Sequence, residues 1–444
     1  MNEGATHDHP RLPPGPRGPA AYHTLRFMLW PDAFLGDMRR FGDVFRVRAV
    51  NLKGVGVMSA DLAKDIFAKD PDKAFDVFSG PLRHVFGPKS LFTTAGPTHR
   101  KARKLLNPRF HGQRMKSFSQ TMQNVARAHF ARLRPGDRVK MSDVGQAISL
   151  DVIIETVFGS GGIDRARTRA LLGSLLDGFS PAVIFAERLQ TRLFPPWRRY
   201  LEKREGFDAF VRETVAKRRA GEPGEDILGL LVSARYEDGS GLDDIEIRDH
   251  LFALLMAGHE TTAIAIAWAT YFFLREDRAR QKLLAEVDAI EPLSVDALVK
   301  APYLGAFCDE TLRTKPIVLD VVRPAAETMR VGAYEVPKGE AIIIFLAAIL
   351  SDPKTFPNPE RFDPERFLGK DVPASAFLPF GGGHRRCLGA AFAEQEMRIV
   401  LGTLARELDL ELVSRAPEHA VRRNVTMGPS RGVPVIVRGK RARS

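Results

Sequence analysis

The spacing of apolar and polar residues predicts a mostly helical chain with short strands toward its two ends. "FGDVFRVRA" and "KGVGVMS", between residues 41 and 59, alternate residue by residue, which predicts two strands of a small sheet. From about residue 98 to 290 helical periodicity dominates, broken at "RPGD", "GSGG", "FPPW" and "GEPGED". Short strands are expected again between Thr328 and Leu346.

The last quarter of the chain predicts a loop, a helix and a hairpin. The loop is the Pro-rich "SDPKTFPNPERFDPERFLGKD", the helix is "AAFAEQEMRIVLGTLARELDLEL", and the hairpin is "NVTMGPSRGVPVIVRG". No internal repeat or separating linker occurs along the chain. We therefore expect a single large domain over residues 1–444, mainly α with a minor β region, a Pro/Gly-rich extended N-terminus at 1–20 and a basic tail at 438–444.

The longest predicted helix has polar residues at its centre. It begins at an acidic cap near Asp243 and runs to about Arg275, roughly 48 Å, and its middle is apolar nearly all round. Yet "AGHETT", residues 257–262, interrupts that middle. Gly258 costs about 1 kcal/mol relative to Ala in a helix, and Glu260 is costly to bury without a partner. This combination indicates a functional site, the alternative being a locally satisfied polar patch.

Composition places the chain among soluble globular proteins. Hydrophobic residues make up 44% and charged residues 27%, which is ordinary for a globular protein. The start of the chain has no apolar run of the signal-peptide kind, and the ten-residue run "AIIIFLAAIL" is too short to span a bilayer, which takes about 20 residues. With two cysteines and no disulfide framework, we expect a soluble, cytoplasmic protein without an integral membrane segment.

The net charge of +12 leaves three kinds of partner open: nucleic acid, an anionic membrane surface or an acidic protein. Seven basic residues and no acid lie between Gly96 and Lys116: Arg100, Lys101, Arg103, Lys104, Arg109, Arg114 and Lys116. This cluster is either a solvated face or a docking surface. No nucleic-acid-binding motif accompanies it, so we expect no nucleic-acid partner.

The loop "FGGGHRRCLG", residues 380–389, places Cys387 among glycines and positive charge. A structural zinc site needs about four ligands, and no second Cys/His pair is near His384 and Cys387. "HETTA" is not the H-E-x-x-H zinc motif, and nothing positive supports a nucleophilic cysteine. A single thiolate ligand to haem iron would explain all of these features. The glycines would let the backbone come close to a flat cofactor, and Arg385 could neutralise a propionate. The N-terminus of the following helix would stabilise the negative charge of the thiolate.

The loop resembles the haem-binding signature of the cytochromes P-450, which reads Phe, Gly, any, Gly, any, Arg, any, Cys, any, Gly. Four further segments resemble motifs of that family, as does the proline-rich start of the chain, and all occur in family order from about residue 12 to 435. They are "LPPGP", "GPTHRKAR", "AGHETT", "ETLR" and "PERF". The resemblance implies a cytochrome P-450 fold with the long central helix over haem b, and a haem-thiolate monooxygenase activity.

The resemblance also implies residue roles on the cofactor side. Cys387 would be the axial ligand of the iron, whereas Cys308 is expected in the core. Glu310, Arg313 and Arg366 would form a buried ion-pair network that holds the haem loop. The remaining cofactor contacts implied are Phe380, Gly381 and Gly389 in the loop, and His99, Arg103, Arg323 and Arg385 at the propionates.

On the substrate side, Glu260 and Thr261 match the acid–alcohol pair that delivers protons to bound dioxygen, and Gly258 would leave room for it. Residues expected to line the pocket are Phe75, Phe78, Leu82, Val85, Phe86, Ala257, Val318, Leu319 and Met427. Most are apolar, so the expected substrate is a hydrophobic small molecule of fatty-acid, terpenoid or polyketide type. Arg83 would be a candidate anchor for a carboxylate.

The resemblance implies separate electron donors, because the chain carries no flavin or iron–sulfur domain. The expected partner is a ferredoxin or flavodoxin with its NAD(P)H reductase, docking on a basic face below the haem. Two other functions stay open: a haem-thiolate protein that binds a ligand without turnover, and a basic nucleic-acid-binding protein. The intact Glu260–Thr261 pair argues against a protein that only binds a ligand. The absence of a nucleic-acid-binding motif in the sequence argues against the nucleic-acid-binding protein.

Overall fold

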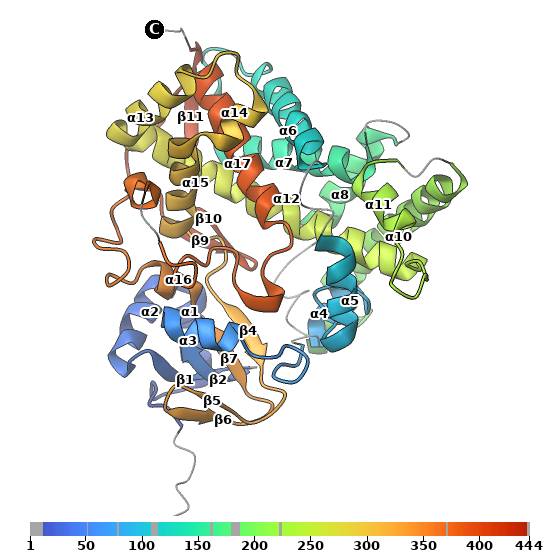
Figure 1. Ribbon diagram of the computed structural model, residues 1–444, viewed down its shortest axis with the longest axis vertical. Helices are drawn as coiled ribbons and strands as arrows, with labels where there is room; N and C mark the ends of the chain where they lie inside the picture. Colours follow the sequence, from blue (N-terminus) through green and yellow to red (C-terminus); the bar gives the residue numbers. More distant parts are fainter. Residues whose placement is uncertain are drawn as a thin grey trace, which may run out of the picture. The chain divides into compact units, whose positions relative to one another are not determined.

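The computed structural model describes residues 12–50, 52–77, 80–107, 114–159, 163–178, 187–221, 224–369 and 372–441 (Figure 1). Its contacts group the chain into two compact units. We call Met1–Phe78, Val318–Pro359 and Val372–Arg386 the sheet unit, and Ser79–Ile317, Glu360–Asp371 and Cys387–Ser444 the helical unit. That the whole chain is one domain stays a prediction.

The sheet unit is built on a four-stranded sheet in the order β1-β2-β7-β4. Strands β1 (Val44–Ala49) and β2 (Leu52–Val57) pair antiparallel, so the predicted strand pair is confirmed. Strand β7 (Ala341–Ile344) runs parallel to β2 and antiparallel to β4 (Val321–Pro324). Strands β5 (Met329–Val331) and β6 (Tyr334–Val336) form a separate pair. The apolar run Ala341–Leu350 thus divides into β7 and the short helix α16 (Leu346–Leu350).

The core of the sheet unit lies between this sheet and helix α3 (Ala60–Phe67). Ser59 caps the helix by accepting a hydrogen bond from the Leu62 amide, and Ile66 packs into the same cluster as Val55 and Ile342. Burial of this apolar face stabilises a helix too short to persist alone. The other elements of the unit are α1 (Ala20–Leu29), α2 (Pro31–Met38) and the 3₁₀ turns η1 (Arg39–Phe41) and η5 (Gly383–Arg385).

The helical unit contains the segments in which helical periodicity dominates the sequence. Its helices are α4 (Gly80–Phe86), α5 (Gly96–Leu106), α6 (Arg114–Phe130), α7 (Met141–Phe158), α8 (Arg165–Asp177), α10 (Pro195–Ala220), α11 (Ile227–Ser233), α12 (Asp244–Arg275), α13 (Asp277–Asp288), α14 (Val295–Lys300), α15 (Pro302–Thr314) and α17 (Ala390–Glu407). In the described part of this unit, the 3₁₀ turns η3 (Glu187–Leu189) and η4 (Pro364–Phe367) accompany the helices.

Helix α12 is the predicted long helix, and its bounds follow from its caps. The Asp243 side chain accepts from the Glu246 amide, and the Glu246 side chain accepts from the Asp243 amide, which completes a capping box. The helix packs closely on α7: a Cβ added at Gly145 would lie 2.9 Å from the Ala263 carbonyl oxygen. Its apolar window is long enough to cross a membrane, but 72% of that window is buried inside the fold. These features identify an interior helix.

Two predictions for the end of the chain are wrong. Residues Leu408–Leu412 form strand β8 instead of the last turns of α17, since apolar and acidic residues alternate there. The predicted hairpin does not form, because its two halves pair elsewhere. Strand β10 (Thr426–Pro429) pairs with β9 (Ala420–Arg423), whereas β11 (Pro434–Lys440) lies between β3 (Arg138–Lys140) and β8.

Candidate functional site

The glycines before Cys387 are fixed by close packing against α3. Gly381 and Gly383 have φ angles of 67° and 65°, which L residues with a side chain rarely adopt. Only glycine fits at position 382, because a Cβ there would lie 2.4 Å from the Phe67 ring. At Gly383 a Cβ would lie 2.7 Å from the Phe67 carbonyl oxygen. The glycine run therefore gives the loop one conformation, set by a helix distant in the sequence.

The two cysteines have opposite environments. Cys308, on α15, is buried, and burial raises the pKa of its thiol. Cys387 is exposed and lies two residues before Gly389, the N-cap of α17. The partial positive charge of a helix N-terminus favours an anion there, so Cys387 has the surroundings of a reactive thiolate and Cys308 those of a core residue.

Glu310 lies at the centre of a buried ion-pair cluster. Nε of Arg313, one turn further along α15, donates to Oε2 of Glu310 at 2.6 Å. Nε of Arg366, in η4, lies 3.4 Å from Oε1, and the Asp363 amide donates to the same oxygen at 2.8 Å. Burial raises the pKa of Glu310 and the Arg313 charge opposes that shift. The structure thus brings the three predicted network residues together.

The predicted propionate ligands lie in two pairs. In the sheet unit, Arg323 on β4 is close enough to Arg385 for that charge to act on it; burial and Arg385 together lower the pKa of Arg323 to about 10. In the helical unit, His99 is buried and Arg103 half-buried, one turn apart on α5. Two arginines that disfavour each other's charge are suited to an anionic group between them. The Arg323–Arg385 pair therefore fits the carboxylate side chains of a haem.

Two hydroxyls in the middle of α12 bond to the helix backbone. Thr261 Oγ1 donates to the Ala257 carbonyl at 2.7 Å, and Thr262 Oγ1 donates to the Gly258 carbonyl at 2.9 Å. Such bonds to the residue four positions earlier often bend a helix. Ala257 and Thr261 share one face of α12, and Ala257 is exposed although most of its neighbours on the helix are buried.

Glu260 has a partner, as the cost of burial requires. Thr426 Oγ1, on β10, lies 3.3 Å from Oε1 of Glu260. Burial raises the pKa of this carboxyl, while Thr426 and the charge of Arg423 oppose the shift. The raised pKa makes this half-buried carboxyl easier to protonate than an exposed one. The absent side chain of Gly258 faces α7, where a Cβ would lie 3.4 Å from Cδ1 of Ile153.

The predicted substrate-pocket residues are distributed over both units. In the sheet unit, Phe75 forms a bridge with Ala325, Val318 is half-buried and Leu319 is buried. In the helical unit, Leu82 is half-buried, whereas Val85, Phe86 and Met427 are buried. Arg83 is exposed. Phe78 lies outside the described residues. Among these positions, half-buried apolar residues such as Leu82 and Val318 are the ones that a bound molecule could contact.

Sequence reasoning missed the residues that hold the end of α4. The Val85 carbonyl accepts hydrogen bonds from Tyr200 Oη, at 2.9 Å, and from Nη1 of Arg204, both on α10. The Arg204 guanidinium lies over the Phe252 ring of α12, 4.0 Å from its centroid. No local signal marks Tyr200 or Arg204, because their partner is a backbone oxygen far away in the sequence.

The basic cluster of α5 is partly matched by acids. Lys101 Nζ lies 2.7 Å from Asp238, and Lys104 pairs with Glu237, both acids belonging to the turn before α12. Lys101 also lies over the Tyr236 ring at 4.2 Å. These pairs are solvent-exposed, and such pairs contribute little to stability. Arg109 lies outside the described residues, and the same holds for the side chain of Arg114.

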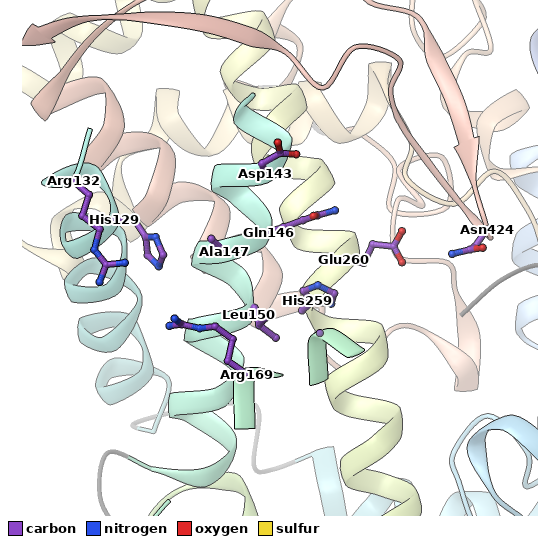
Figure 2. Close-up of a pocket in the computed structure, with 11 residues that line it drawn as sticks. His129, Arg132, Asp143, Gln146, Ala147, Leu150, Arg169, His259, Glu260 and Asn424 are labelled. Carbon is purple, nitrogen blue, oxygen red and sulfur yellow. The ribbon is translucent and has the colours of Figure 1, made fainter. Parts of the chain in front are cut away.

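A cavity of about 620 Å³, lined by both polar and apolar residues, reaches Glu260 from the side of α7 (Figure 2). Helix α7 contributes one stripe, Asp143, Gln146, Ala147 and Leu150, and α12 contributes His259 and Glu260. His129 and Arg132 lie at the far side in Figure 2, and Asn424, in the turn between β9 and β10, lies beside Glu260. The α7 stripe has helical spacing, which is the one sequence signal that could have found this cavity.

Comparison with known proteins identifies the family. The family model for cytochrome P-450 matches residues 13–433. Putative cytochrome P-450 138 of Mycobacterium tuberculosis is 33% identical over 437 residues, covering 96% of each chain. Putative cytochrome P-450 135B1 of the same organism is 32% identical over 445 residues, covering 97% of this chain and 92% of its own. The structure of retinoic acid bound cyanobacterial CYP120A1 matches with a TM-score of 0.85 at 24% identity, covering 97% of this chain and 100% of its own.

The mainly helical fold with small sheets and a long interior helix agrees with the fold of this family. The chain belongs to the cytochrome P-450 family and is a monooxygenase, and the family's cofactor is haem held by a cysteine thiolate. Within the described ranges, no three His, Cys, Asp or Glu side chains gather as ligands for a separate metal ion.

Proposed function

We propose that the protein inserts one atom of O2 into a hydrophobic small molecule, by hydroxylation or epoxidation, with two electrons supplied by separate redox proteins. Haem b held by Cys387 would supply the activation of O2 and the transfer of its oxygen. One observation carries the assignment of the ligand. Of the two cysteines in the chain, Cys387 alone is exposed, and it follows a glycine loop whose conformation is fixed immediately before α17.

Several residues of the chain would hold the cofactor. Arg323 and Arg385 would bind propionates through charge-assisted hydrogen bonds, and His99 and Arg103 on α5 are the other candidates for this role. The Glu310–Arg313–Arg366 cluster holds η4 against α15, because the buried charges are paired only when these two elements lie together. The proximity of Arg323 and Arg385 supports this assignment, since an anion between them removes their mutual repulsion.

Glu260 and Thr261 handle protons on the α12 side. The carboxyl of Glu260 takes up a proton from solvent and gives it up toward the Ala257–Thr261 face of the helix. Thr261 holds a water molecule there through its hydroxyl, which can donate to one partner and accept from another. The raised pKa of Glu260 supports this role, because a carboxyl that is easier to protonate can take up a proton from water and pass it on.

The substrate class and the partner follow from the chemistry of the surfaces. The half-buried apolar side chains of Leu82 and Val318 favour a fatty acid, terpenoid or polyketide-like molecule. The exposed lysines of α5 favour an acidic ferredoxin or flavodoxin, reduced by an NAD(P)H reductase in the cytoplasm.

Spectroscopy of two alanine variants tests the proposal. Cys387→Ala should lose the absorption bands of the thiolate-ligated, reduced carbon-monoxide complex, whereas Cys308→Ala should keep them. The reverse result would assign the iron ligand to Cys308. A screen of hydrophobic compounds for shifts of the haem spin state in the wild-type protein then identifies the substrate class, and product analysis with a surrogate ferredoxin and reductase shows whether oxygen is inserted.

A further inference from the structure

The last turn of α4 ends on a carbonyl that takes its partners from another helix. The final carbonyls of a helix have no donor within that helix. The Val85 carbonyl accepts hydrogen bonds from Tyr200 Oη, at 2.9 Å, and from Nη1 of Arg204, both on α10. A guanidinium at this end also offsets the partial negative charge of the helix C-terminus. Because α4 is too short to persist alone, contacts of this kind hold it in place.

The turn that follows α4 is held by Asp249 of α12. The Lys89 amide donates to Oδ2 of Asp249 at 2.9 Å. Gly87 has a φ angle of 88°, and a Cβ at this position would lie 2.1 Å from Oδ1 of Asp249. Position 87 therefore requires glycine for its backbone conformation and for the space that the carboxylate occupies.

Arg204 joins the two contacts. Its Nη1 reaches the Val85 carbonyl, while its Nη2 lies 3.8 Å from Oδ1 of the fully buried Asp249. Its Nε donates to Asp208 at 2.8 Å. Arg248 donates from Nε to Asp249 at 2.9 Å, and its Nη1 lies 3.5 Å from Asp208. Two arginines and two aspartates thus form a cluster without net charge, and removing one of them would leave a buried charge without its partner.

Aromatic packing connects the same three helices. The Arg204 guanidinium lies over the Phe252 ring of α12, 4.0 Å from its centroid. Phe86 of α4 and Phe207 of α10 pack against this ring as well, with centroids 5.6 Å and 5.5 Å away. A shift of α4 would therefore disturb close packing around Phe252 in addition to breaking hydrogen bonds.

We propose that Tyr200, Arg204 and Asp249, which we call the α4 clamp, determine which molecules fit beside the haem, by holding α4 in place. The inference rests on the function proposed above, in which α4 residues such as Leu82 line the substrate pocket. Val85 belongs to that predicted wall and also carries the clamped carbonyl, so the wall moves when the carbonyl moves. The clamp residues are thus positioning residues, which set specificity through α4.

A second buried arginine provides the matched control. Arg406 is 7% exposed, as Arg204 is, and it donates to the Val287 and Asp288 carbonyls at the end of α13. Arg204→Met and Arg406→Met therefore each remove a buried guanidinium from a helix C-terminus. Both should destabilise the fold, and only Arg204→Met should change the haem pocket.

Hydrogen exchange of backbone amides tests the clamp itself. In Arg204→Met the amides of residues 82–89 should exchange several-fold faster than in the wild type, whereas Arg406→Met should speed exchange at the end of α13 instead. Tyr200→Phe removes one of the two hydrogen bonds to the Val85 carbonyl and should give a smaller increase. It decides the matter if Arg204→Met does not fold. Unchanged exchange in α4 would overturn the proposal.

Two iron ligands of different size test the effect on the pocket. Imidazole needs only the iron, whereas phenylimidazole also needs an apolar wall for its ring. Spectral titration of the haem-loaded protein should show several-fold weaker binding of phenylimidazole to Arg204→Met, with imidazole binding and the reduced carbon-monoxide spectrum unchanged. Arg406→Met should keep the wild-type ratio of the two affinities. A wild-type ratio in Arg204→Met, despite faster exchange in α4, would overturn the proposal.

Failure of the oxygenase function gives a different result. If the wild type forms no thiolate-type carbon-monoxide complex and binds neither imidazole compound, the proposed function and the role of the clamp in specificity fail together. If the wild type binds both compounds and oxidises a hydrophobic molecule, but Arg204→Met and Tyr200→Phe bind phenylimidazole as tightly as it does, the oxygenase function stands and the clamp has no part in specificity.

Discussion

Glu310 accepts two hydrogen bonds from Arg313, from Nε at 2.6 Å and from Nη2 at 2.8 Å, and both side chains are shielded from water. The pair is bidentate, the geometry in which arginine binds a carboxylate most specifically. Because Asp363 and Arg366 bind the same carboxylate, this pair connects α15 to the segment around η4. The chain before the cysteine loop is thereby tied to an interior helix.

Removing the Glu310 charge should be costly to the fold. Glu310→Gln keeps the side-chain shape but leaves the buried Arg313 without its counter-charge, and breaking such a pair costs about 3–5 kcal/mol. We expect that loss in the free energy of unfolding, measured with urea. Glu365→Gln is the control, since its partner Lys282 is in a solvent-accessible pair and little change should follow. Equal effects of the two substitutions would show that the Glu310 cluster contributes no more than a surface pair.

Thr261→Ala should uncouple the enzyme without weakening substrate binding. If the Thr261 hydroxyl, on the Ala257 face of α12, holds a water as proposed, its loss should affect steps after O2 binds and leave the apolar contacts of the substrate unchanged. Reductant consumption should continue while peroxide rises several-fold and product falls. Thr262→Ala removes a hydroxyl with the same backbone bond from a neighbouring position, and it should stay coupled. Equal coupling in both variants would remove Thr261 from the mechanism.

The basic face of α5 should govern the rate of electron transfer. Reversal of Arg100, Lys101 and Lys104 to Glu should slow reduction by an acidic ferredoxin, and the wild-type rate should fall as salt shortens the Debye length from about 10 Å at 0.1 M. Stopped-flow reduction at several ionic strengths measures both effects. Substrate-induced spin shifts should be unchanged by the reversal.

The acids that face α5 allow a test in the opposite direction. Asp238 and Glu237 pair with Lys101 and Lys104 and offset part of the basic charge. Substituting both acids by Lys should therefore speed reduction at low salt. A rate that responds neither to these substitutions nor to ionic strength would leave the α5 cluster as a solvated face.

Glu396 should make stability fall with rising pH. This α17 carboxyl is wholly buried, and burial raises its pKa from 4.5 to about 8, with Ser149 opposing the shift. An acid whose pKa is higher in the folded state binds its proton more tightly when folded. Its stabilising contribution is complete below pH 4.5 and is lost as the pH rises to about 8, a loss of a few kcal/mol.

Urea unfolding of the haem-loaded protein at a series of pH values checks this. Glu396→Gln should unfold at denaturant concentrations that depend less on pH, and its stability relative to the wild type should grow from pH 4.5 to pH 8. Glu202→Gln, on the exposed side of α10, is the control and should follow the wild-type profile. Parallel profiles for Glu396→Gln and the wild type would show that this carboxyl does not titrate across that range.

What the sequence predicted well depends on local signals. The start of α12 could be placed because Asp243 and Glu246 are capping residues three positions apart, and the β1–β2 pair because its residues alternate. The family motifs located Glu310, Arg313 and Arg366, which the structure brings together.

Contacts between distant segments could not be predicted. Gly382 is required by Phe67, and Tyr200 finds its partner in the Val85 backbone, neither of which leaves a mark nearby in the sequence. The end of the chain was misread for the same reason: β10 and β11 each pair with strands outside the segment that seemed to contain a hairpin. Pairing partners are chosen by the whole fold, and local periodicity does not encode them.

The difference in exposure between Cys387 and Cys308 means that a thiol reagent can label the protein at a single position. A maleimide or a fluorescent thiol reagent has one accessible sulfur to attack, since the other is enclosed in α15. If Cys387 is the iron ligand, as proposed, binding of the cofactor should stop that reaction. The number of thiols titrated per chain would then count the cofactor-free molecules directly.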